Sequence, residues 1–370
     1  MALKNTTDPA AAAKALEGWL ATKLPDASDI EVTNVTTPSA AGLSAETILF
    51  DAAWTTGGAR ETHELVARVA PSTPGVFPTF DLPKEFAVVD ALAGSGVPIP
   101  KAWWIEEDES VFGGAFLVLD RIAGRIPADD PPFTAAGWVA ELSPEDRRRL
   151  VEQSIAGMAA IHAADWRAIG LGSLETNPGA SRIDEQLKTW RAYFDWARGE
   201  DENPAVEAGF AWLGENKPAE EGPSVLNWGD ARPGNQIFGD DLSVAATLDW
   251  EMVDIGTAEM DLAWWIFILR HHTEGIGVPM PEGIPVREEL VAIYERASGT
   301  TVRDLDYYEV FAAVRLSAIM HRAGRLMVEV GFLPPDATMK LNNPASQLLA
   351  KLIGFDAPTG EAQSFIGNRG

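Results

Sequence analysis

Residues 227–238, NWGDARPGNQIF, bring an acid, a guanidinium and an amide together in a short stretch that also holds two glycines and a proline. Asp230 precedes Asn235 by five residues, and Asp249 follows Asp230 by nineteen. Carboxylate and amide oxygens suit Mg²⁺, which takes few protein ligands and shares the rest of its coordination with phosphates and water. We therefore predict that Asn235 and Asp249 face a magnesium ion and that Asp230 accepts a proton from a substrate hydroxyl.

Arg232 lies two residues after Asp230, where its charge could meet a transferring phosphoryl group. The alternative is a turn rich in Asp and Asn that only hydrogen-bonds its own backbone. Because that alternative requires three separate spacings to coincide by chance, the sequence favours a phosphoryl-transfer site.

Two short strand-like runs would have to position these side chains, SVLNW at 224–228 and SVAATLDW at 243–250. We predict that they pair as a hairpin-like ribbon, which would bring Asn235 close to Asp249. Both runs lie in a part of the chain where apolar periodicity and capping residues predict helices. These helices are expected at 143–166, 181–199, 204–215, 257–272, 287–298 and 304–330.

The first 120 residues have a different pattern, because β-branched and alternating apolar residues recur there. Strands are predicted at 30–37, 46–54, 63–70, 101–108 and 115–122. A helix follows the third strand: Asp81 can cap it, and Pro83 fits its first turn. The pattern indicates an α+β fold, in which a small β-rich lobe joins a larger helical lobe near 120–124.

The segment WGDARPGN followed by LDWE resembles the catalytic loop and metal-binding segment of the aminoglycoside phosphotransferase and choline kinase families, and more distantly those of protein kinases. It is most similar to a bacterial branch related to the kinase-like domains fused to some acyl-CoA dehydrogenases. The resemblance, over about 35–330, implies a bilobal protein-kinase-like fold. A nucleotide-binding lobe with one key helix would span 1–120, a hinge 121–124, and a helical lobe with the catalytic loop and acceptor site 125–370.

The resemblance implies transfer of the γ-phosphoryl group of ATP, with Mg²⁺, to a hydroxyl of a small molecule. Asp230 matches the catalytic base, Asn235 and Asp249 match the Mg²⁺ ligands, and Arg232 takes the position of the loop Lys of protein kinases. Trp228 stands where the family usually has a His that is mainly a packing residue, so we expect a buried ring here.

In the strand lobe, the family pairs a basic residue on the third strand with a helix Glu, to hold the α and β phosphates. Arg68 stands where Lys is common, and Glu85 lies on the following helix. Arg carries the same charge but is larger and binds as a fork. The alternative is an ordinary surface ion pair, worth under about 1 kcal/mol.

The resemblance also indicates nucleotide contacts through the backbone. Gly42 and Ser44 stand in the phosphate-covering segment 36–50, which lacks a Gly-x-Gly-x-x-Gly pattern and equally fits a plain hairpin turn. Asp120 and Ile122, in FLVLDRIAGRIP, would bind the edge of adenine through their backbone groups.

Other polar residues are expected to be structural. His162 lies on an apolar helix and is expected to pack in the scaffold rather than act in catalysis. His271 and His272 are adjacent and point to different helix faces, which disfavours a shared metal site. In the family, an acid at the position of Asp261 braces the catalytic loop.

Composition limits the other possibilities. The chain has 370 residues, 46% of them hydrophobic, which is enough to bury a substantial core. The absence of cysteine excludes disulfides, thiolate catalysis and Cys-based zinc sites, and fits a reducing compartment. The start lacks the apolar core of a secretory signal. The most apolar run, 262–269, is shorter than the roughly 20 residues that a membrane helix needs. We expect a cytoplasmic protein.

The charge is strongly acidic, since 29 Lys and Arg against 55 Asp and Glu give −26. Such a surface repels nucleic acid and anionic membrane, so neither is expected as a partner. It suits a cationic or neutral small substrate, although solubility alone is the simpler explanation of the charge.

Two other functions remain open. A pseudokinase, meaning a catalytically weak or inactive nucleotide-binding protein, would account for the unusual Trp228 and Arg68, but the complete catalytic set argues against it. A protein kinase would need an extended peptide-docking segment after Asp249, and Asp261 follows after only 12 residues.

Overall fold

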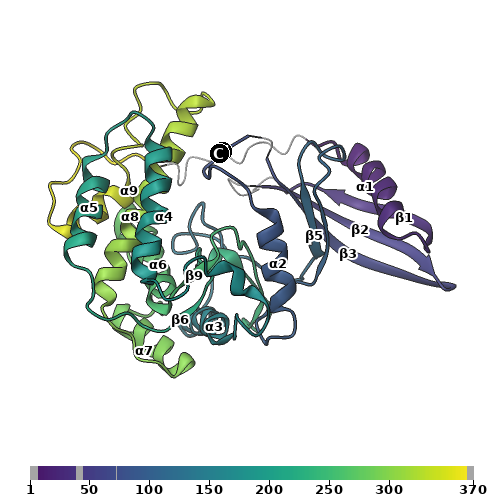
Figure 1. Cartoon of the computed structure of the whole chain (residues 1–370), viewed down its shortest axis with the longest axis horizontal. Coiled ribbons are helices and arrows are strands. Elements are labelled where there is room, and N and C mark those ends of the chain that lie inside the picture. Colours follow the sequence, from purple (N-terminus) through teal and green to yellow (C-terminus); the bar gives the residue numbers. More distant parts are fainter. Residues whose placement is uncertain (1–6, 39–44, 72, 365–370) are drawn as a thin grey trace. The chain divides into compact units, whose positions relative to one another are not determined.

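The computed structural model describes residues 7–38, 45–71 and 73–364. The chain divides into two compact units: Met1–Ala93 with Pro100–Ile122, and Gly94–Ile99 with Ala123–Gly370. The first unit is built on a sheet and the second mainly on helices (Figure 1). The predicted α+β class is confirmed.

The first unit contains a five-stranded antiparallel sheet in the order β1-β2-β3-β5-β4. Every second residue of β2 is buried, from Ile48 to Trp54, as expected of a strand with one face on a core. The strands are β1 (Ser28–Thr36), β2 (Glu46–Thr56), β3 (Ala59–Val69), β4 (Ala102–Glu106) and β5 (Phe116–Asp120).

A helix that was not predicted, α1 (Pro9–Lys23), covers the buried face of this sheet. The ring centroids of Trp19 on α1 and Phe116 on β5 are 4.8 Å apart. The signal was present in the sequence, because Asp8 caps α1 and Pro9 occupies its first turn. The first unit therefore holds α1 in addition to the one key helix that was predicted.

The predicted helix is α2 (Leu82–Leu92), and its predicted cap is confirmed: the Asp81 side chain accepts a hydrogen bond from the Lys84 backbone N–H. Its buried face includes Val88, Val89 and Leu92, and also one acid, Glu85. An acid buried in this way needs a partner, and β3 provides one.

The second unit is organised around α6 (Ala258–His271), in which every residue of 259–269 is buried. A helix that is apolar all round belongs in the middle of a core, and α8 packs along it. The six predicted helices are confirmed within three residues at each end, while α9 was missed. The other helices are α3 (Pro144–Ala163), α4 (Arg182–Arg198), α5 (Pro204–Glu215), α7 (Arg287–Ser298), α8 (Leu305–Glu329) and α9 (Pro344–Ile353).

The predicted ribbon between 224–228 and 243–250 is wrong. Instead β6 (Ser224–Asn227) pairs with β9 (Asp254–Thr257), and β7 (Gln236–Phe238) pairs with β8 (Val244–Thr247). A five-residue connection joins β7 to β8, so this local pairing is the shorter loop to close. Gly256 lets β6 approach β9, because a Cβ at this position would lie 1.9 Å from the Asn227 amide oxygen.

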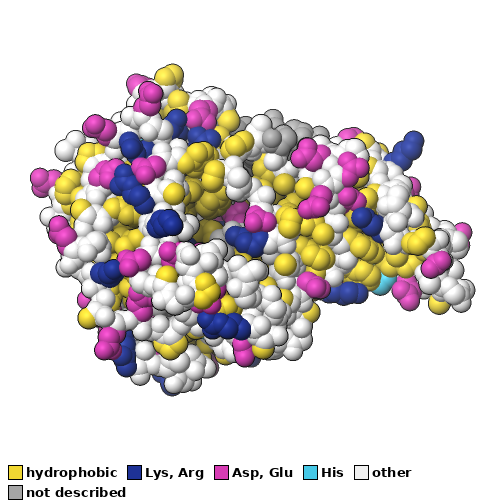
Figure 2. Space-filling model, viewed as in Figure 1, with side chains coloured by type: hydrophobic (Ala, Val, Ile, Leu, Met, Phe, Trp, Pro, Cys, Tyr) yellow, Lys and Arg dark blue, Asp and Glu magenta, His cyan; other side chains and the backbone are white. Residues whose placement is uncertain are grey.

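Charged side chains of both signs are interleaved on the face shown in Figure 2, so the acidity of the chain does not gather in one patch of that face. None of the described helices is both long and apolar enough to cross a membrane.

Two neighbouring histidines are buried where α6 ends. Burial lowers the pKa of His271 to about 3 and that of His272 to about 4. Among the described residues, the Nδ1 atoms of both rings have no hydrogen-bond partner. Both side chains are therefore neutral in the folded protein at pH 5 to 8.

We predict that the protein loses stability as pH falls from about 6.5 towards 4, because the unfolded chain binds protons at His271 and His272 there while the folded chain does not. By pH 5 each histidine costs on the order of 2 kcal/mol of unfolding free energy. Denaturant melts from pH 7.5 to 5 measure the slope, and His272→Gln should make it shallower. An unchanged slope in that variant would contradict this account.

Candidate active site

The loop before Asp230 is held by Asp261, a wholly buried acid in the first turn of α6. The two carboxylate oxygens of Asp261 accept the backbone N–H groups of Trp228 and Gly229, at 2.7 and 2.9 Å. His162 Nε2 lies 3.0 Å from the same carboxylate, and its Nδ1 lies 2.8 Å from the Tyr294 hydroxyl. The expected scaffold roles of Asp261 and His162 are confirmed.

Residues 228 and 229 also join the loop to the segment that carries Asp249. The Trp228 ring is fully buried, as predicted, and its indole N–H donates to the Leu248 carbonyl at 2.8 Å. Gly229 has φ +91°, and a Cβ there would lie 2.1 Å from the Met252 carbonyl oxygen. Only glycine allows this approach.

Three side-chain donors hold the Asp230 carboxylate. Oδ2 accepts from Arg232 Nε at 2.8 Å and from Asn235 Nδ2 at 2.7 Å, and Oδ1 accepts from Trp264 Nε1 at 2.7 Å. The side chain remains 14% exposed, so it is fixed but reachable. Trp264 was not predicted as a site residue, although it lies three residues after Asp261 on the same helix face.

The Arg232 guanidinium forms ion pairs with two acids. Its Nε binds Asp230, and its Nη1 binds Asp129, a residue that the sequence did not indicate. Burial opposes the charge of Arg232, but the carboxylates of Asp129 and Asp230 outweigh it and raise the Arg232 pKa. The guanidinium is thus directed at one acid of the loop, Asp230, and at one acid from outside it, Asp129.

Asn235 and Asp249 come together through a different ladder from the predicted one. The Leu248 N–H donates to the Asn235 carbonyl at 2.9 Å, which puts Asp249 one residue from this bond. Asp249 has φ +63°, a left-handed conformation that costs about 1–3 kcal/mol and gathers at functional sites. The Asn235 amide nitrogen donates to the Asp230 carbonyl and carboxylate, so the amide oxygen faces away from that acid.

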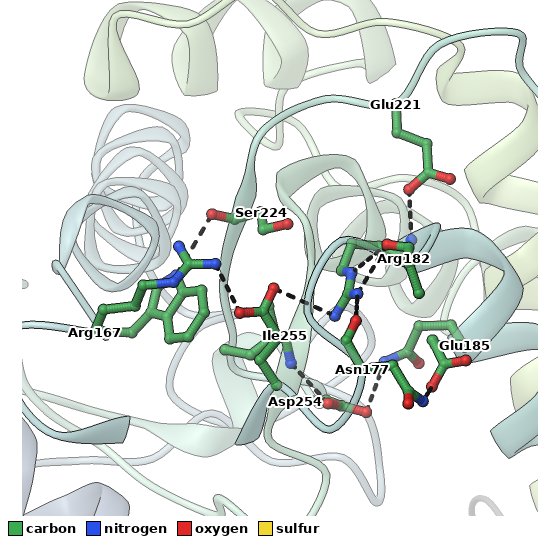
Figure 3. A network of polar contacts seen from close by, with 12 residues as sticks. Arg167, Asn177, Arg182, Glu185, Glu221, Ser224, Asp254 and Ile255 are labelled. Carbon is green, nitrogen blue, oxygen red and sulfur yellow. Dashed lines mark hydrogen bonds and ion pairs between the residues drawn. The ribbon is translucent and has the colours of Figure 1, made fainter. Parts of the chain in front are cut away.

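A polar network fixes the strands on either side of the loop (Figure 3). Gln186 on α4 donates to the carboxylate of Asp254, the first residue of β9, at 2.7 Å. The Arg182 backbone N–H, in the first turn of α4, donates to Glu221 at 2.7 Å, just before β6 begins. Hydrogen bonds therefore connect α4 to β9 and to the segment that leads into β6.

In the first unit, Arg68 on β3 and Glu85 on α2 form the predicted ion pair, with 3.5 Å between Nη1 and Oε2. The Arg68 side chain is 17% exposed and that of Glu85 is 3% exposed. This burial does not fit the alternative of an ordinary surface ion pair.

The other predicted nucleotide contacts involve residues 42, 44, 120 and 122. Gly42 and Ser44 lie outside the described residues. Asp120 ends β5; its N–H donates to the Lys101 carbonyl at 2.9 Å, and its carboxylate accepts from the Trp103 indole at 2.5 Å. Ile122 is the last residue of the first unit. Their contacts with adenine stay predictions.

No group of three or more His, Cys, Asp or Glu side chains that could hold a metal occurs among the described residues. A pair such as Asn235 and Asp249 fits Mg²⁺ better than ions that need a full protein cage, because Mg²⁺ completes its shell with water and phosphate oxygens.

Comparisons with known proteins agree with the predicted resemblance. The chain is 30% identical over 265 residues to acyl-CoA dehydrogenase family member 11 of Gallus gallus, covering 69% of this chain and 33% of that protein. The Rattus norvegicus protein of the same name is 27% identical over 296 residues, covering 76% and 37%. The chain thus spans about a third of the length of these curated relatives.

Solved structures show the same kinase-like fold. A Ralstonia eutropha protein named as an aminoglycoside phosphotransferase has a TM-score of 0.66 at 24% identity, with 92% of this chain and 95% of that chain covered. An aminoglycoside phosphotransferase in ternary complex with ADP and hygromycin B has 0.56 at 18%, covering 93% and 100%. A Plasmodium vivax ethanolamine kinase has 0.56 at 10%, covering 86% and 82%.

The predicted family is confirmed by a match over most of the chain. Residues 45–311 fit the model of the phosphotransferase enzyme family, a range that includes β2, the ion pair of β3 and α2, and the whole loop around Asp230. The chain belongs to the phosphotransferase enzyme family.

Proposed function

We propose that this protein transfers the γ-phosphoryl group of ATP, with Mg²⁺, to a hydroxyl group of a small molecule. The observation that carries the proposal is the Asp230 carboxylate, held by three donors and still reachable. Family membership supports the reaction class, and the relatives that bind ADP with hygromycin B or are named for ethanolamine support a small-molecule acceptor.

Asp230 would act as the base. Its neighbours fix the carboxylate in one orientation, so a hydroxyl that reaches it meets a prepared acceptor. Arg232, bound to Asp129 and Asp230, offsets the repulsion between these two acids and keeps both beside the loop. We assign Arg232 this supporting role in catalysis.

Asn235 and Asp249 would hold the metal. The Asn235 amide oxygen and the Asp249 carboxylate are hard oxygen donors on adjacent backbone, and the left-handed strain at Asp249 is the kind of cost that a functional position bears. When bound, Mg²⁺ neutralises charge on the phosphates. The two residues would hold the ion and would leave its remaining coordination to the nucleotide and water.

The nucleotide would be held by groups of the first unit. Arg68, braced by Glu85, would bind the α and β phosphates as a fork. Gly42 and Ser44 would cover the phosphates, and the backbone groups at 120 and 122 would meet adenine.

We also propose a cytoplasmic location, which the absence of cysteine supports.

The reaction is tested with a panel of neutral, cationic and anionic hydroxyl compounds, with ADP release as the readout. We predict turnover on at least one class and a loss of 10² or more in Asp230→Asn, because a positioned base contributes on the order of 10²–10⁴. The melting temperature of the variant serves as the folding control. Full turnover in a folded Asp230→Asn protein would remove Asp230 from the role of base.

Nucleotide titrations by calorimetry, with and without Mg²⁺, test the binding groups separately. Asp249→Ala should lose the tightening of ATP binding by Mg²⁺, because the carboxylate no longer shares the ion with the phosphates. Arg68→Ala should weaken ATP binding under both conditions, and Arg68→Lys should retain much of it, because Lys keeps the charge.

The outcomes separate the two functions. Wild-type Mg²⁺ dependence in Asp249→Ala would make the metal assignment wrong, and wild-type affinity in Arg68→Ala would do the same for the phosphate site. Binding of ATP without turnover on any hydroxyl compound would favour the pseudokinase.

A further inference from the structure

Asp230 does not present two equivalent oxygens. Oδ2 accepts two hydrogen bonds, from Arg232 and Asn235, whereas Oδ1 accepts one, from Trp264. Each carboxylate oxygen has about two acceptor directions. Oδ2 is therefore saturated, and one direction is left on Oδ1 among the residues that the structure describes.

The indole that occupies the other direction of Oδ1 is itself held in place. The Arg315 guanidinium on α8 lies 4.5 Å from the Trp264 ring centroid and 4.6 Å from that of Trp190, so the cation faces both rings. Its Nη2 donates to the Gly229 carbonyl at 2.9 Å, one residue before the base. Arg315 thus contacts both the Trp264 ring and the loop that carries Asp230.

Arg315 is an unusual residue to find here. The residue is 4% exposed, its Nε has no hydrogen-bond partner among the described residues, and burial lowers its pKa to about 10. Burying a guanidinium this way is costly, and stacking between two indoles offsets only part of that cost. A cost of this kind is consistent with a function in positioning.

We propose that Trp264 is a positioning residue for phosphoryl transfer, which directs the free acceptor position of Asp230 Oδ1 at the substrate hydroxyl while Arg315 fixes the indole. The hydroxyl proton passes to Oδ1 as the hydroxyl oxygen bonds to the γ-phosphorus and the bond from phosphorus to ADP breaks. This inference rests on the function proposed above, and it selects the oxygen that receives the proton.

The fold supplies a matched control, Trp265, on the same helix. Its indole is also buried and also donates to one buried acceptor, which is the Ser154 hydroxyl at 3.0 Å and not Asp230. Replacement by Phe removes one N–H and keeps an aromatic ring in either case. A purely structural role for Trp264 predicts that the two variants behave alike.

The kinetic test compares kcat and the KM of the hydroxyl substrate for Trp264→Phe, Trp265→Phe and the wild type. Loss of the indole N–H leaves Oδ1 without its positioning contact, so Trp264→Phe should lower kcat about tenfold and leave KM within about twofold of the wild type. Trp265→Phe should keep the wild-type kcat even if its melting temperature falls. An unchanged kcat in a folded Trp264→Phe protein would overturn the proposal.

A second readout needs no turnover. In protein labelled with 5-fluorotryptophan, the fluorine resonance of Trp264, assigned as the one missing in Trp264→Phe, should shift in Asp230→Asn, while that of Trp265 should not. A shift with no hydroxyl substrate found would leave the positioning contact standing and remove the proposed reaction. An unshifted Trp264 resonance would overturn the positioning role, whatever the enzyme's activity.

Discussion

Asp261 accepts the backbone N–H groups of Trp228 and Gly229, and the geometry of the site depends on this contact. A fully buried carboxylate is costly unless it is well hydrogen-bonded, and here it also meets His162 and stands in the first turn of α6, where the helix dipole favours an anion. Hydrogen bonds to a charged group contribute about 1.5–3 kcal/mol each, so the loop is held firmly at these two peptides.

The same two residues also help to position Asp230 and Asp249, the two acids of the proposed chemistry. The Trp228 indole reaches the carbonyl next to Asp249, and Gly229 lies against the Met252 backbone. One residue further on, Asp230 accepts a hydrogen bond from the Trp264 indole, which lies on the same helix as Asp261. The proposed base, the proposed metal-binding acid and the helix that braces them therefore form one connected piece of structure within the second unit.

The residue types and spacing around Asp230 were enough to predict the candidate site from the sequence. The helices with clear caps and periodicity were predicted as well. The prediction failed on β6 to β9, because strands of three or four residues carry too little alternation to select a partner, and the loop from β7 to β8 decided the pairing. Trp264 and Asp129 were missed because they meet Asp230 and Arg232 across 34 and 103 residues of sequence. No local spacing encodes such contacts.

The most direct test of this account is amide hydrogen exchange at Trp228 and Gly229 in Asp261→Asn, measured together with phosphoryl transfer. The asparagine keeps the size of the side chain but replaces one acceptor oxygen by an NH₂ group, which cannot accept one of the two N–H groups. The account predicts exchange at least about tenfold faster at these two amides and a matching loss of turnover, with helix content preserved. Unchanged protection and unchanged turnover would contradict it.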